Sequence, residues 1–316
     1  MHTTGKIVVV GSANMDMVIG VERLPREGET ITGTDLRLFP GGKGANQACC
    51  AGRLGRRVSM IGQVGDDAFG SALIDSLSAA NIDVAGIGRS NRPTGCASIY
   101  VMPDGENSIV ISPGANATLD PETAVQRLDV GEGDIVLCQL ETPLDTVEAV
   151  LAHAKARGAV TILDPAPARM LPAQVLRKID FVTPNQTEAG VLLDDRDLEI
   201  DGFDRARDAA ARLIQLGPSA VVMKLGEIGA LVWDGRHSVE AGAFRVQAVD
   251  TTAAGDAFNG AFAVALAEGK QIGDALLFAN AVAGISVTRP GAQPSMPTRS
   301  EVDEFLSAAG QAAQND

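Results

Sequence analysis

The sequence predicts an α/β fold in which helices cover both faces of a doubly wound, mostly parallel sheet. Short β-branched runs alternate with stretches whose apolar residues recur at three-and-four spacing, and this alternation requires crossover connections. The 316 residues include 45% hydrophobic and 21% charged side chains, enough for a full core. We expect one α/β domain over residues 1–316, with a small antiparallel β-sheet lid inserted at about 15–40 and 95–113.

The strands of the main sheet are expected where short apolar runs end in loops. Lys6–Val10 stops at Gly11-Ser12 and is the first of these runs. Similar runs follow at Val58–Ile61, Ile135–Leu137, Val160–Leu163, Phe181–Thr183 and Ala220–Met223. Amphipathic helices are expected between them at Phe69–Asn81, Leu144–Ala156 and Phe203–Leu216.

Two stretches break the alternation and predict the lid. Met17–Leu38 carries short apolar runs separated by turn residues, while Cys96–Met102 and Asn107–Ser112 flank Pro103-Asp104-Gly105, a good hairpin turn. We expect them to form one small sheet that covers the ligand edge of the main sheet. The polar tail Gln311–Asp316 is expected to be non-helical and frayed.

Charge and composition exclude several functional classes. Lys and Arg number 26 against 40 Asp and Glu, and the net charge of −14 repels nucleic acids and anionic membranes. No apolar run approaches a signal peptide or a membrane span, so we expect a cytoplasmic protein with no membrane partner. The cysteines lack a C-x-x-C pair and the histidines lack zinc spacing, so we expect reduced, core-filling cysteines and no transition metal.

The segment from Asp250 to Asp256 carries the strongest chemical signal. Its small residues run into an apolar-faced helix, so backbone N–H groups at the helix start are available to an anion. Asp256 in that first turn is placed to accept a proton from a hydroxyl group beside the anion. A base next to an anion site suits phosphoryl transfer to an alcohol, although an ordinary N-terminal cap is the alternative.

Two further loops offer groups for hydroxyl-rich ligands. Gly41 to Asn46 combines glycines with Lys43 and Asn46, and it lacks the G-x-x-x-x-G-K-[ST] spacing of a P-loop. Asn14 and Asp16 follow the first strand and suit vicinal hydroxyls. A G-x-G-x-x-G fingerprint is missing there, which argues against a dehydrogenase. Both loops also have a plain structural reading, as a tight loop before a helix and a polar loop after a strand.

A fourth segment, Asn185-Gln186-Thr187-Glu188, begins a helix after a strand. Glu188 in the first turn is suited to hold Mg²⁺ through water, because Mg²⁺ keeps most of its water ligands. The alternative is a capping box, in which the same glutamate satisfies the helix start.

With these segments in place, the chain resembles the ribokinase-like, phosphofructokinase B-type family of carbohydrate kinases from Lys6 to about Phe305. The family's segments occur in the family's order: GSANMD, GGKGANQA, GDDAFG, QLETP, DPAPAR, TPNQTE, DTTAAGDAFNGA and VTRPGAQPSMP. The family signature commonly has Gly where this chain has Ala253, whose backbone N–H group is retained. Eight segments in order make the resemblance highly specific.

The resemblance implies a role for each matching residue. The sugar would be held by Asn14, Asp16, Gly42, Lys43, Asn46 and Glu141, with Asp256 as the base for its 5-hydroxyl. The N–H groups of Ala253, Ala254, Gly255 and Asp256 would stabilise the transferred phosphoryl group. ATP would contact Asn185, Lys224, Leu225, Gly226, Glu227, Gly229, Gly255 and Asn280. Glu188 would organise Mg²⁺ through water, and an activating K⁺ would bind at Asp250, Thr252, Ser286, Arg289, Gly291 and Ser295.

The resemblance implies ATP-dependent phosphorylation of D-ribose at O5 and a homodimer formed through the lid. Other acceptors stay open, namely 2-deoxyribose, fructose, nucleosides and pseudouridine. A sugar phosphate is less favoured because Lys43 is the one cation in the substrate segments, and an aromatic content of 3% makes a nucleobase clamp hard to assemble. A sugar-binding regulator without catalysis is the alternative from another class, and the presence of Asp256 with its anion site argues against it.

Overall fold

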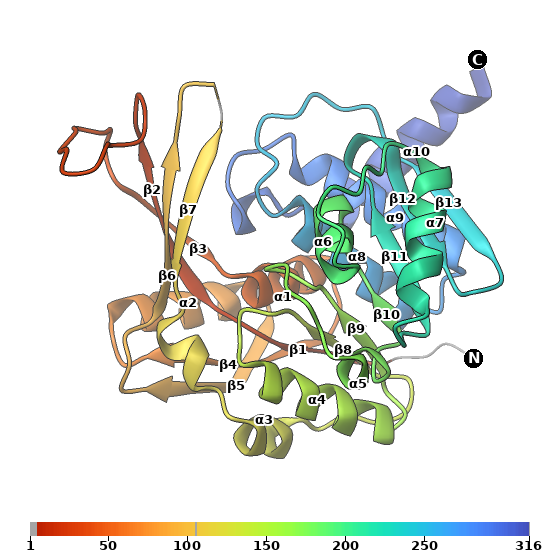
Figure 1. Ribbon diagram of the computed structural model, residues 1–316, viewed down its shortest axis with the longest axis horizontal. Coiled ribbons are helices and arrows are strands. Elements are labelled where there is room, and N and C mark those ends of the chain that lie inside the picture. Colours follow the sequence, from red (N-terminus) through yellow and green to blue (C-terminus); the bar gives the residue numbers. More distant parts are fainter. Residues whose placement is uncertain (1–4, 105, 316) are drawn as a thin grey trace.

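The computed structural model describes residues 5–104 and 106–315 and confirms the α/β class (Figure 1). The main sheet contains β1 (Ile7–Val10), β4 (Val58–Gly65), β5 (Ile82–Ser90), β8 (Ile135–Cys138), β9 (Val160–Leu163), β10 (Phe181–Val182), β11 (Ala220–Lys224), β12 (Gly229–Trp233) and β13 (Ser238–Gly242). Within the described ranges these nine strands have the order β13-β12-β11-β10-β9-β8-β1-β4-β5. All pairings from β11 to β5 are parallel, and β12 and β13 add an antiparallel edge. The chain winds outward from β1 in both directions, as predicted.

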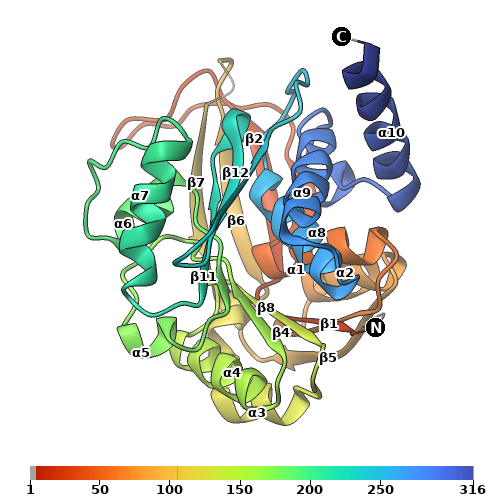
Figure 2. The ribbon, with the colours of Figure 1, turned by 90° about the vertical axis from the view of Figure 1, so that its right-hand side faces the viewer.

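Helices cover both faces of this sheet (Figure 2). One face carries α1 (Lys43–Arg53), α2 (Ala68–Ala79), α8 (Ala254–Ala267), α9 (Ile272–Ser286) and α10 (Arg299–Asn315). The other carries α3 (Pro121–Arg127), α4 (Leu144–Ala156), α5 (Ala173–Leu176), α6 (Gln186–Leu192) and α7 (Phe203–Ile214). Successive residues of β1 point to opposite faces, so Ile7 and Val9 join the first core while Val8 and Val10 join the second. A strand buried on both faces explains why β1 has no polar alternation.

A smaller sheet stands away from the main one at one end of the molecule (Figure 1). It contains β2 (Asn14–Gly20), β3 (Arg37–Gly41), β6 (Gly95–Val101) and β7 (Asn107–Ser112), in the order β3-β2-β6-β7. The outer pairings β2 with β3 and β6 with β7 are antiparallel as predicted, whereas the central pairing of β2 with β6 is parallel. Within the stretch Met17–Leu38, the expected second run at residues 30–32 is irregular and forms no strand, and Gly105 of the expected turn lies outside the described residues. We call this sheet the lid.

Several smaller expectations have clear outcomes. The prediction of a non-helical tail is wrong for residues 311–315, because α10 continues to Asn315 and its Ala- and Gln-rich end favours helix; Asp316 lies outside the described residues. Cys49, Cys50 and Cys138 are free and buried, while Cys96 is half-buried. In the part of the chain that the structure describes, no helix has the length and apolar character that crossing a bilayer requires.

Candidate active site

Polar residues converge where parallel strands of the main sheet end. Asn14 lies just beyond β1, Glu141 beyond β8 and Asp164 beyond β9, and Lys224 ends β11. Because the carboxyl ends of parallel strands share one edge, these side chains come from one side of the sheet. Hydrogen bonds then join this edge to the starts of α1 and α8. The structure therefore brings together segments from most of the length of the chain.

The start of α8 is an unusual turn. Ala253, the residue before the helix, has φ 60° and ψ 15°, the left-handed region that L-residues rarely occupy. Ala254 N donates to Thr251 O over 3.2 Å, so one of the four predicted N–H groups is already bonded within the turn. Ala257 N makes a helical bond to Ala253 O at 2.8 Å. Gly255 and Asp256 lie in the first turn, where N–H groups lack helical acceptors.

Asp256 is 4% exposed, and its carboxylate is held by two amides. Asn46 Nδ2 donates to Oδ2 over 3.0 Å, and Gln47 Nε2 donates to Oδ1 over 2.9 Å. Burial raises the pKa of Asp256, while the positive charge of Lys43 and the two amide bonds oppose that rise. A buried carboxylate with an elevated pKa is suited to accept a proton near neutral pH.

The predicted sugar residues lie around Glu141. Its Oε2 accepts from Ser12 Oγ, from Lys43 N at 3.1 Å and from Asn14 Nδ2 at 3.4 Å. Asn14 is fixed from its other side, because Asn116 Nδ2 donates to its Oδ1 over 2.7 Å. These bonds preorganise amide and carboxylate groups that hydroxyl ligands need.

Glycines allow the loop before α1 to approach this cluster. A Cβ atom on Gly41 would lie 2.1 Å from Asp16 Oδ2, and one on Gly42 would lie 2.7 Å from Asn14 N. Gly42 also has φ 88°, which other residues rarely adopt. A larger residue at either position would displace the backbone or the Asp16 carboxylate.

Carboxylates dominate the electrostatics of this half of the site. Burial, together with the charges of Glu141 and Asp256, raises the pKa of Asp16 to about 7. Burial alone lowers the pKa of Lys43, but the charges of Asp256, Asp164, Glu141 and Glu188 outweigh it and raise that pKa overall. Lys43 therefore stays protonated and is the central cation among these acids.

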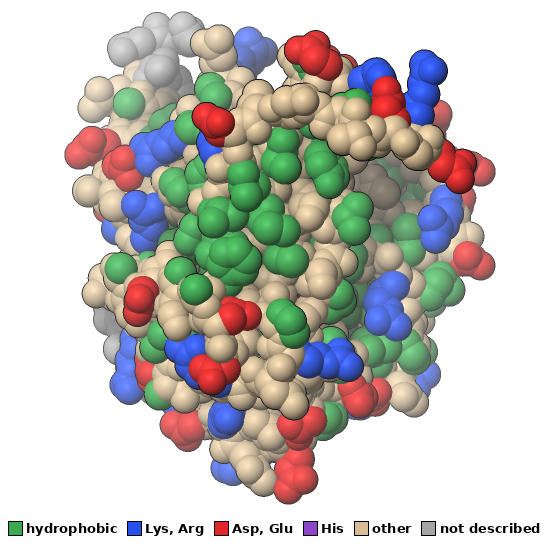
Figure 3. Space-filling view, turned by 90° about the vertical axis from the view of Figure 1, so that its left-hand side faces the viewer, with side chains coloured by type: hydrophobic (Ala, Val, Ile, Leu, Met, Phe, Trp, Pro, Cys, Tyr) green, Lys and Arg blue, Asp and Glu red, His purple; other side chains and the backbone are tan. Residues whose placement is uncertain are grey.

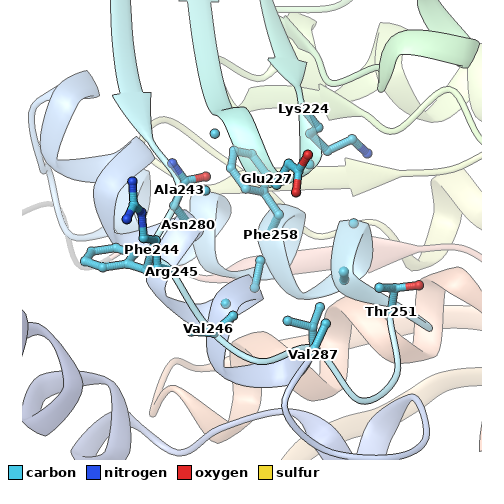
Figure 4. A pocket seen from close by; sticks show the side chains of 17 residues that line it. Lys224, Glu227, Ala243, Phe244, Arg245, Val246, Thr251, Phe258, Asn280 and Val287 are labelled. Atoms are coloured by element: carbon cyan, nitrogen blue, oxygen red, sulfur yellow. The ribbon is translucent and has the colours of Figure 1, made fainter. Parts of the chain in front are cut away.

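A cavity of about 720 Å³ opens beside the start of α8 (Figure 4). Such a volume fits a small ligand or cofactor. Its wall includes five of the residues predicted to bind ATP: Lys224, Gly226, Glu227, Gly229 and Gly255. Asn280 is a sixth predicted ATP residue in this wall, and its Nδ2 donates to Ala241 O and Gly242 O at 2.9 and 3.1 Å. Leu225 instead points into the core beneath α6 and α7, and its side chain is 1% exposed.

Asn185 and Glu188 form the capping box that the sequence offered as the alternative. Asn185 Oδ1 accepts from Glu188 N, and Glu188 Oε2 accepts from Asn185 N, both over 2.8 Å. Glu188 Oε2 also lies 3.9 Å from Lys224 Nζ, which bonds Asp164 Oδ1 at 2.9 Å. Burial raises the pKa of Glu188, and the charge of Lys224 opposes that rise.

Glu188 and Asp164 are carboxylates of the kind that Mg²⁺ takes as ligands. Among the described residues, no group of three or more His, Cys, Asp or Glu side chains is arranged to hold a metal ion. Mg²⁺ does not need such a cage, because it binds through one or two carboxylates, water molecules and phosphate oxygens. Glu188 and Asp164, with side chains 12% and 2% exposed, supply two neighbouring carboxylates of that kind.

The residues predicted for a monovalent cation come from two segments that the structure joins. Asp250 Oδ1 accepts from Thr252 N at 2.9 Å, and Oδ2 accepts from Gly291 N at 2.8 Å. Burial raises the pKa of Asp250, but these bonds outweigh it and hold the pKa below its usual value. Ser286 and Ser295 are buried and bond backbone carbonyls at 2.8 and 2.7 Å, while the Arg289 guanidinium turns to Glu301 at 2.6 Å. Of the six predicted residues, Asp250 is the one that offers an anionic oxygen to a cation, and its carboxylate joins the two segments.

Several residues of the site carried no role in the sequence analysis. Gln47, Gln139 and Asp164 form buried hydrogen bonds next to Asp256, and Phe244 and Val246 line the cavity (Figure 4). Asp164 directly follows a predicted strand, so the rule for carboxyl ends of parallel strands was a usable signal. Gln47 had no such signal, because its importance depends on what α8 places opposite it.

The comparisons with known proteins agree with this geometry. The chain matches the family described as pfkB family carbohydrate kinase over residues 4–299. It is 42% identical to a ribokinase of Haemophilus influenzae over 305 residues, which are 96% of this chain and 99% of the relative. A solved ribokinase from Thermotoga maritima matches with a TM-score of 0.86 at 39% identity, covering 96% of this chain and 99% of that one. An Arabidopsis thaliana ribokinase structure, complexed with ribose and ATP, matches with a TM-score of 0.86 at 36% identity and coverages of 96% and 98%.

Proposed function

We propose, from the premise that this chain belongs to the pfkB family of carbohydrate kinases, that it transfers the γ-phosphoryl group of ATP to the 5-hydroxyl of D-ribose. The observation that carries the proposal is the position of Asp256. Its carboxylate lies in the first turn of α8, whose Gly255 lines the 720 Å³ cavity, and Asn46 in the first turn of α1, one of the predicted sugar residues, bonds it directly. The candidate base Asp256 thus lies between the cavity that would hold the nucleotide and the polar residues that would hold the sugar. Similarity to ribokinases supports ribose as the acceptor.

The sugar hydroxyls have partners of both kinds. Asn14, Asn46 and Lys43 donate, whereas Asp16 and Glu141 accept. Gly42 lets the sugar approach the backbone. A buried site with this many polar groups penalises any ligand that leaves them unpaired.

The transfer step needs one base and stabilised negative charge. The 5-hydroxyl gives its proton to the Asp256 carboxylate while its oxygen attacks the γ-phosphorus. The bond from that phosphorus to the β,γ-bridging oxygen breaks, and ADP leaves with the electron pair. The N–H groups of Ala253, Gly255 and Asp256 would bind oxygens of the transferred group, whereas that of Ala254 already donates to Thr251 O. Lys224, which lines the cavity wall, would face the phosphates.

Metal ions have assigned places in the proposal. Glu188, with Asp164 beside it, would hold Mg²⁺ through water, and bound Mg²⁺ would neutralise charge on the nucleotide phosphates. Asp250, Thr252, Ser286, Arg289, Gly291 and Ser295 belong to the segments that would surround K⁺. Asp250 already ties Thr252 to Gly291, so a cation there would stiffen the turn that precedes Ala253.

A substrate panel tests the proposal. ADP release is measured with ATP and Mg²⁺ on ribose, 2-deoxyribose, fructose, adenosine and pseudouridine. We expect the highest kcat/KM with ribose. A higher kcat/KM with another acceptor would change the assigned substrate but leave the assignment as a kinase intact. No ADP release with any of the five acceptors would support a binding protein without catalysis.

We also propose that the chain works in the cytoplasm as a homodimer formed through the lid. Leu38, Ile109, Val110 and Ile111 of the lid, and Leu36 just before β3, are between 41% and 66% exposed. Seen from the lid side, the surface carries a broad group of hydrophobic side chains (Figure 3). Apolar area of this kind on one small sheet supports an interface with a second copy.

A further inference from the structure

Gln47 is a fully buried amide that bonds two carboxylates at once. It lies on α1, one residue after Asn46, and its side chain is 0% exposed. Its Nε2 donates to Asp256 Oδ1 and to Asp164 Oδ2, both over 2.9 Å. Gln139 Nε2 donates to its Oε1 over 2.6 Å. Every polar atom of this side chain therefore has a partner.

The partners fix the orientation of the amide. Ionised carboxylates only accept hydrogen bonds, so the NH₂ group of Gln47 must face them and its oxygen must face Gln139. The two N–H bonds are thereby shared between Asp256, the candidate base, and Asp164. The remaining oxygen of Asp164 accepts from Lys224 Nζ, which lines the nucleotide cavity. A continuous buried chain of hydrogen bonds thus runs from the cavity wall to the base.

We propose that Gln47 is a positioning residue for phosphoryl transfer, which holds the Asp256 carboxylate ionised and aimed and separates it from the second buried carboxylate, Asp164. This inference rests on the proposed kinase function. Asn46 and Gln47 bond different oxygens of Asp256, so together they set the plane of the carboxylate. Without the shared NH₂ group, two buried negative charges would face each other and favour uptake of a proton, and a protonated Asp256 cannot act as a base.

Other groups around Asp256 influence its protonation and stay constant in the test. Lys43 on α1 supplies the opposing positive charge, and Asp164 the like charge that Gln47 screens. Asp16 on β2 and the Cys50 thiol on α1 also interact with the Asp256 charge. Glu141, Glu188 and Lys224 influence the protonation of Asp256 indirectly, because their charges act on Asp16, Lys43 and Asp164. The substitutions below leave all of these in place.

The test uses Gln47→Met, which keeps length and volume but removes both donors, and Gln47→Glu, which keeps shape but adds a third carboxylate. Gln63→Met makes the same chemical change on β4, outside the site, and is the matched control. For each folded protein, kcat and KM for ribose are measured from pH 5.5 to 9 at saturating ATP and Mg²⁺. We expect Gln47→Met to lose at least about tenfold in kcat at the acidic end and much less at the alkaline end. The acidic limb of the profile then moves to higher pH, and Gln47→Glu loses more.

A packing role for Gln47 would give a different pattern, namely a lower melting temperature with an unchanged pH profile. That result in either folded variant overturns the proposal, as does a loss shared by Gln63→Met. In the wild-type protein, the Gln47 side-chain ¹⁵N–¹H signals should move with the same pH midpoint as kcat. If the chemical shifts of the Gln47 side chain do not change at the pH midpoint of kcat, the proposal is overturned. This measurement needs only the wild-type protein, so it applies even where both variants fail to fold. Failure of the kinase assignment is distinct, since the wild type itself would then release no ADP.

Discussion

Asn46 Nδ2 lies 3.0 Å from Asp256 Oδ2 although the two residues are 210 positions apart in the chain. Asn46 belongs to α1 and Asp256 to α8, and these helices pack very closely. A Cβ atom on Gly260 of α8 would come within 2.7 Å of Gln47 O and 2.8 Å of Cys50 Cβ on α1. The close contact between the two helix backbones therefore holds Asp256, the candidate base in the first turn of α8, next to Asn46 in the first turn of α1.

Replacing Asp256 with Asn should abolish most of the activity. The substitution is nearly isosteric, but the amide cannot take the hydroxyl proton, so kcat should fall on the order of 10²–10⁴-fold. Asn at this place can accept from only one of the donors Asn46 and Gln47, so a thermal melt checks that the variant is folded. A folded variant that keeps more than about a tenth of wild-type kcat would leave Asp256 only a structural role, as the partner of Asn46 and Gln47.

Asp16 should make activity and stability respond to pH in opposite directions. Its pKa is raised from 3.8 to about 7, so the native state holds a proton that the unfolded state has lost between these values. Stability from this group is present at low pH and is lost as pH rises toward 7, amounting to about 2–4 kcal/mol. Sugar binding needs the ionised form, so kcat/KM should fall as pH drops below about 7.

The variant Asp16→Asn isolates this effect from other titrating groups. The free energy of unfolding of both proteins is measured by urea titration. The difference, variant minus wild type, should increase as the pH rises between 5 and 8. The KM of the variant for ribose should be higher than that of wild type. A difference between the two proteins that is constant over this range would mean that Asp16 titrates at its ordinary pKa.

Local signals were sufficient for part of the site. Asn14 follows a strand, Lys43 and Asn46 follow a glycine loop, and Asp256 lies in a first helical turn. Strand ends and helix starts of an α/β sheet gather at one edge, so placing each residue on its element also places it near the others. The central strands and the main helices were predicted by a different local signal, namely short apolar runs alternating with three-and-four apolar spacing.

Other features depend on tertiary contacts that no local pattern reports. In the sequence, nothing distinguishes Gln47 from the other residues of α1. Only the fold gives it a special position, because α8 and the end of β9 place carboxylates on both sides of it. Leu225 directly follows Lys224, yet its side chain points into the opposite core. Phe244 and Val246 lie in an irregular stretch after β13 with no periodicity, and they form cavity wall only because α9 packs beside them.

The lid should carry the dimer contact. Ile109→Asp together with Ile111→Asp places two charges on an exposed apolar face and should shift the protein from dimer to monomer. Sedimentation velocity over a range of concentrations measures the change. Leu277→Asp, at an exposed apolar position on α9, is the control and should stay dimeric. A wild-type protein that is monomeric at all concentrations contradicts the proposal.

K⁺ should raise the rate by stiffening the turn before Ala253. ADP release in buffer free of K⁺ and Na⁺ should increase when K⁺ is added, without a change in substrate occupancy. Asp250→Asn loses one of the two N–H bonds that join Thr252 to Gly291, so it should need more K⁺ for half-activation. Equal rates with and without K⁺ in the wild type would leave this loop a purely structural role.

Ala253 should be a position where glycine is better than the natural residue. With φ 60° its Cβ atom is strained by an amount that glycine would relieve, while glycine also increases the entropy of the unfolded chain. We expect Ala253→Gly to raise the free energy of unfolding by about 0.5–1 kcal/mol and to keep activity, because the N–H group beside the phosphoryl site is unchanged. Ala253→Val is the opposite control, since a β-branched residue in this conformation should cost both stability and kcat. Urea unfolding and kcat for ribose are measured on the same preparations. A less stable glycine variant would contradict the prediction and show that the added entropy of the unfolded chain outweighs the strain at Ala253.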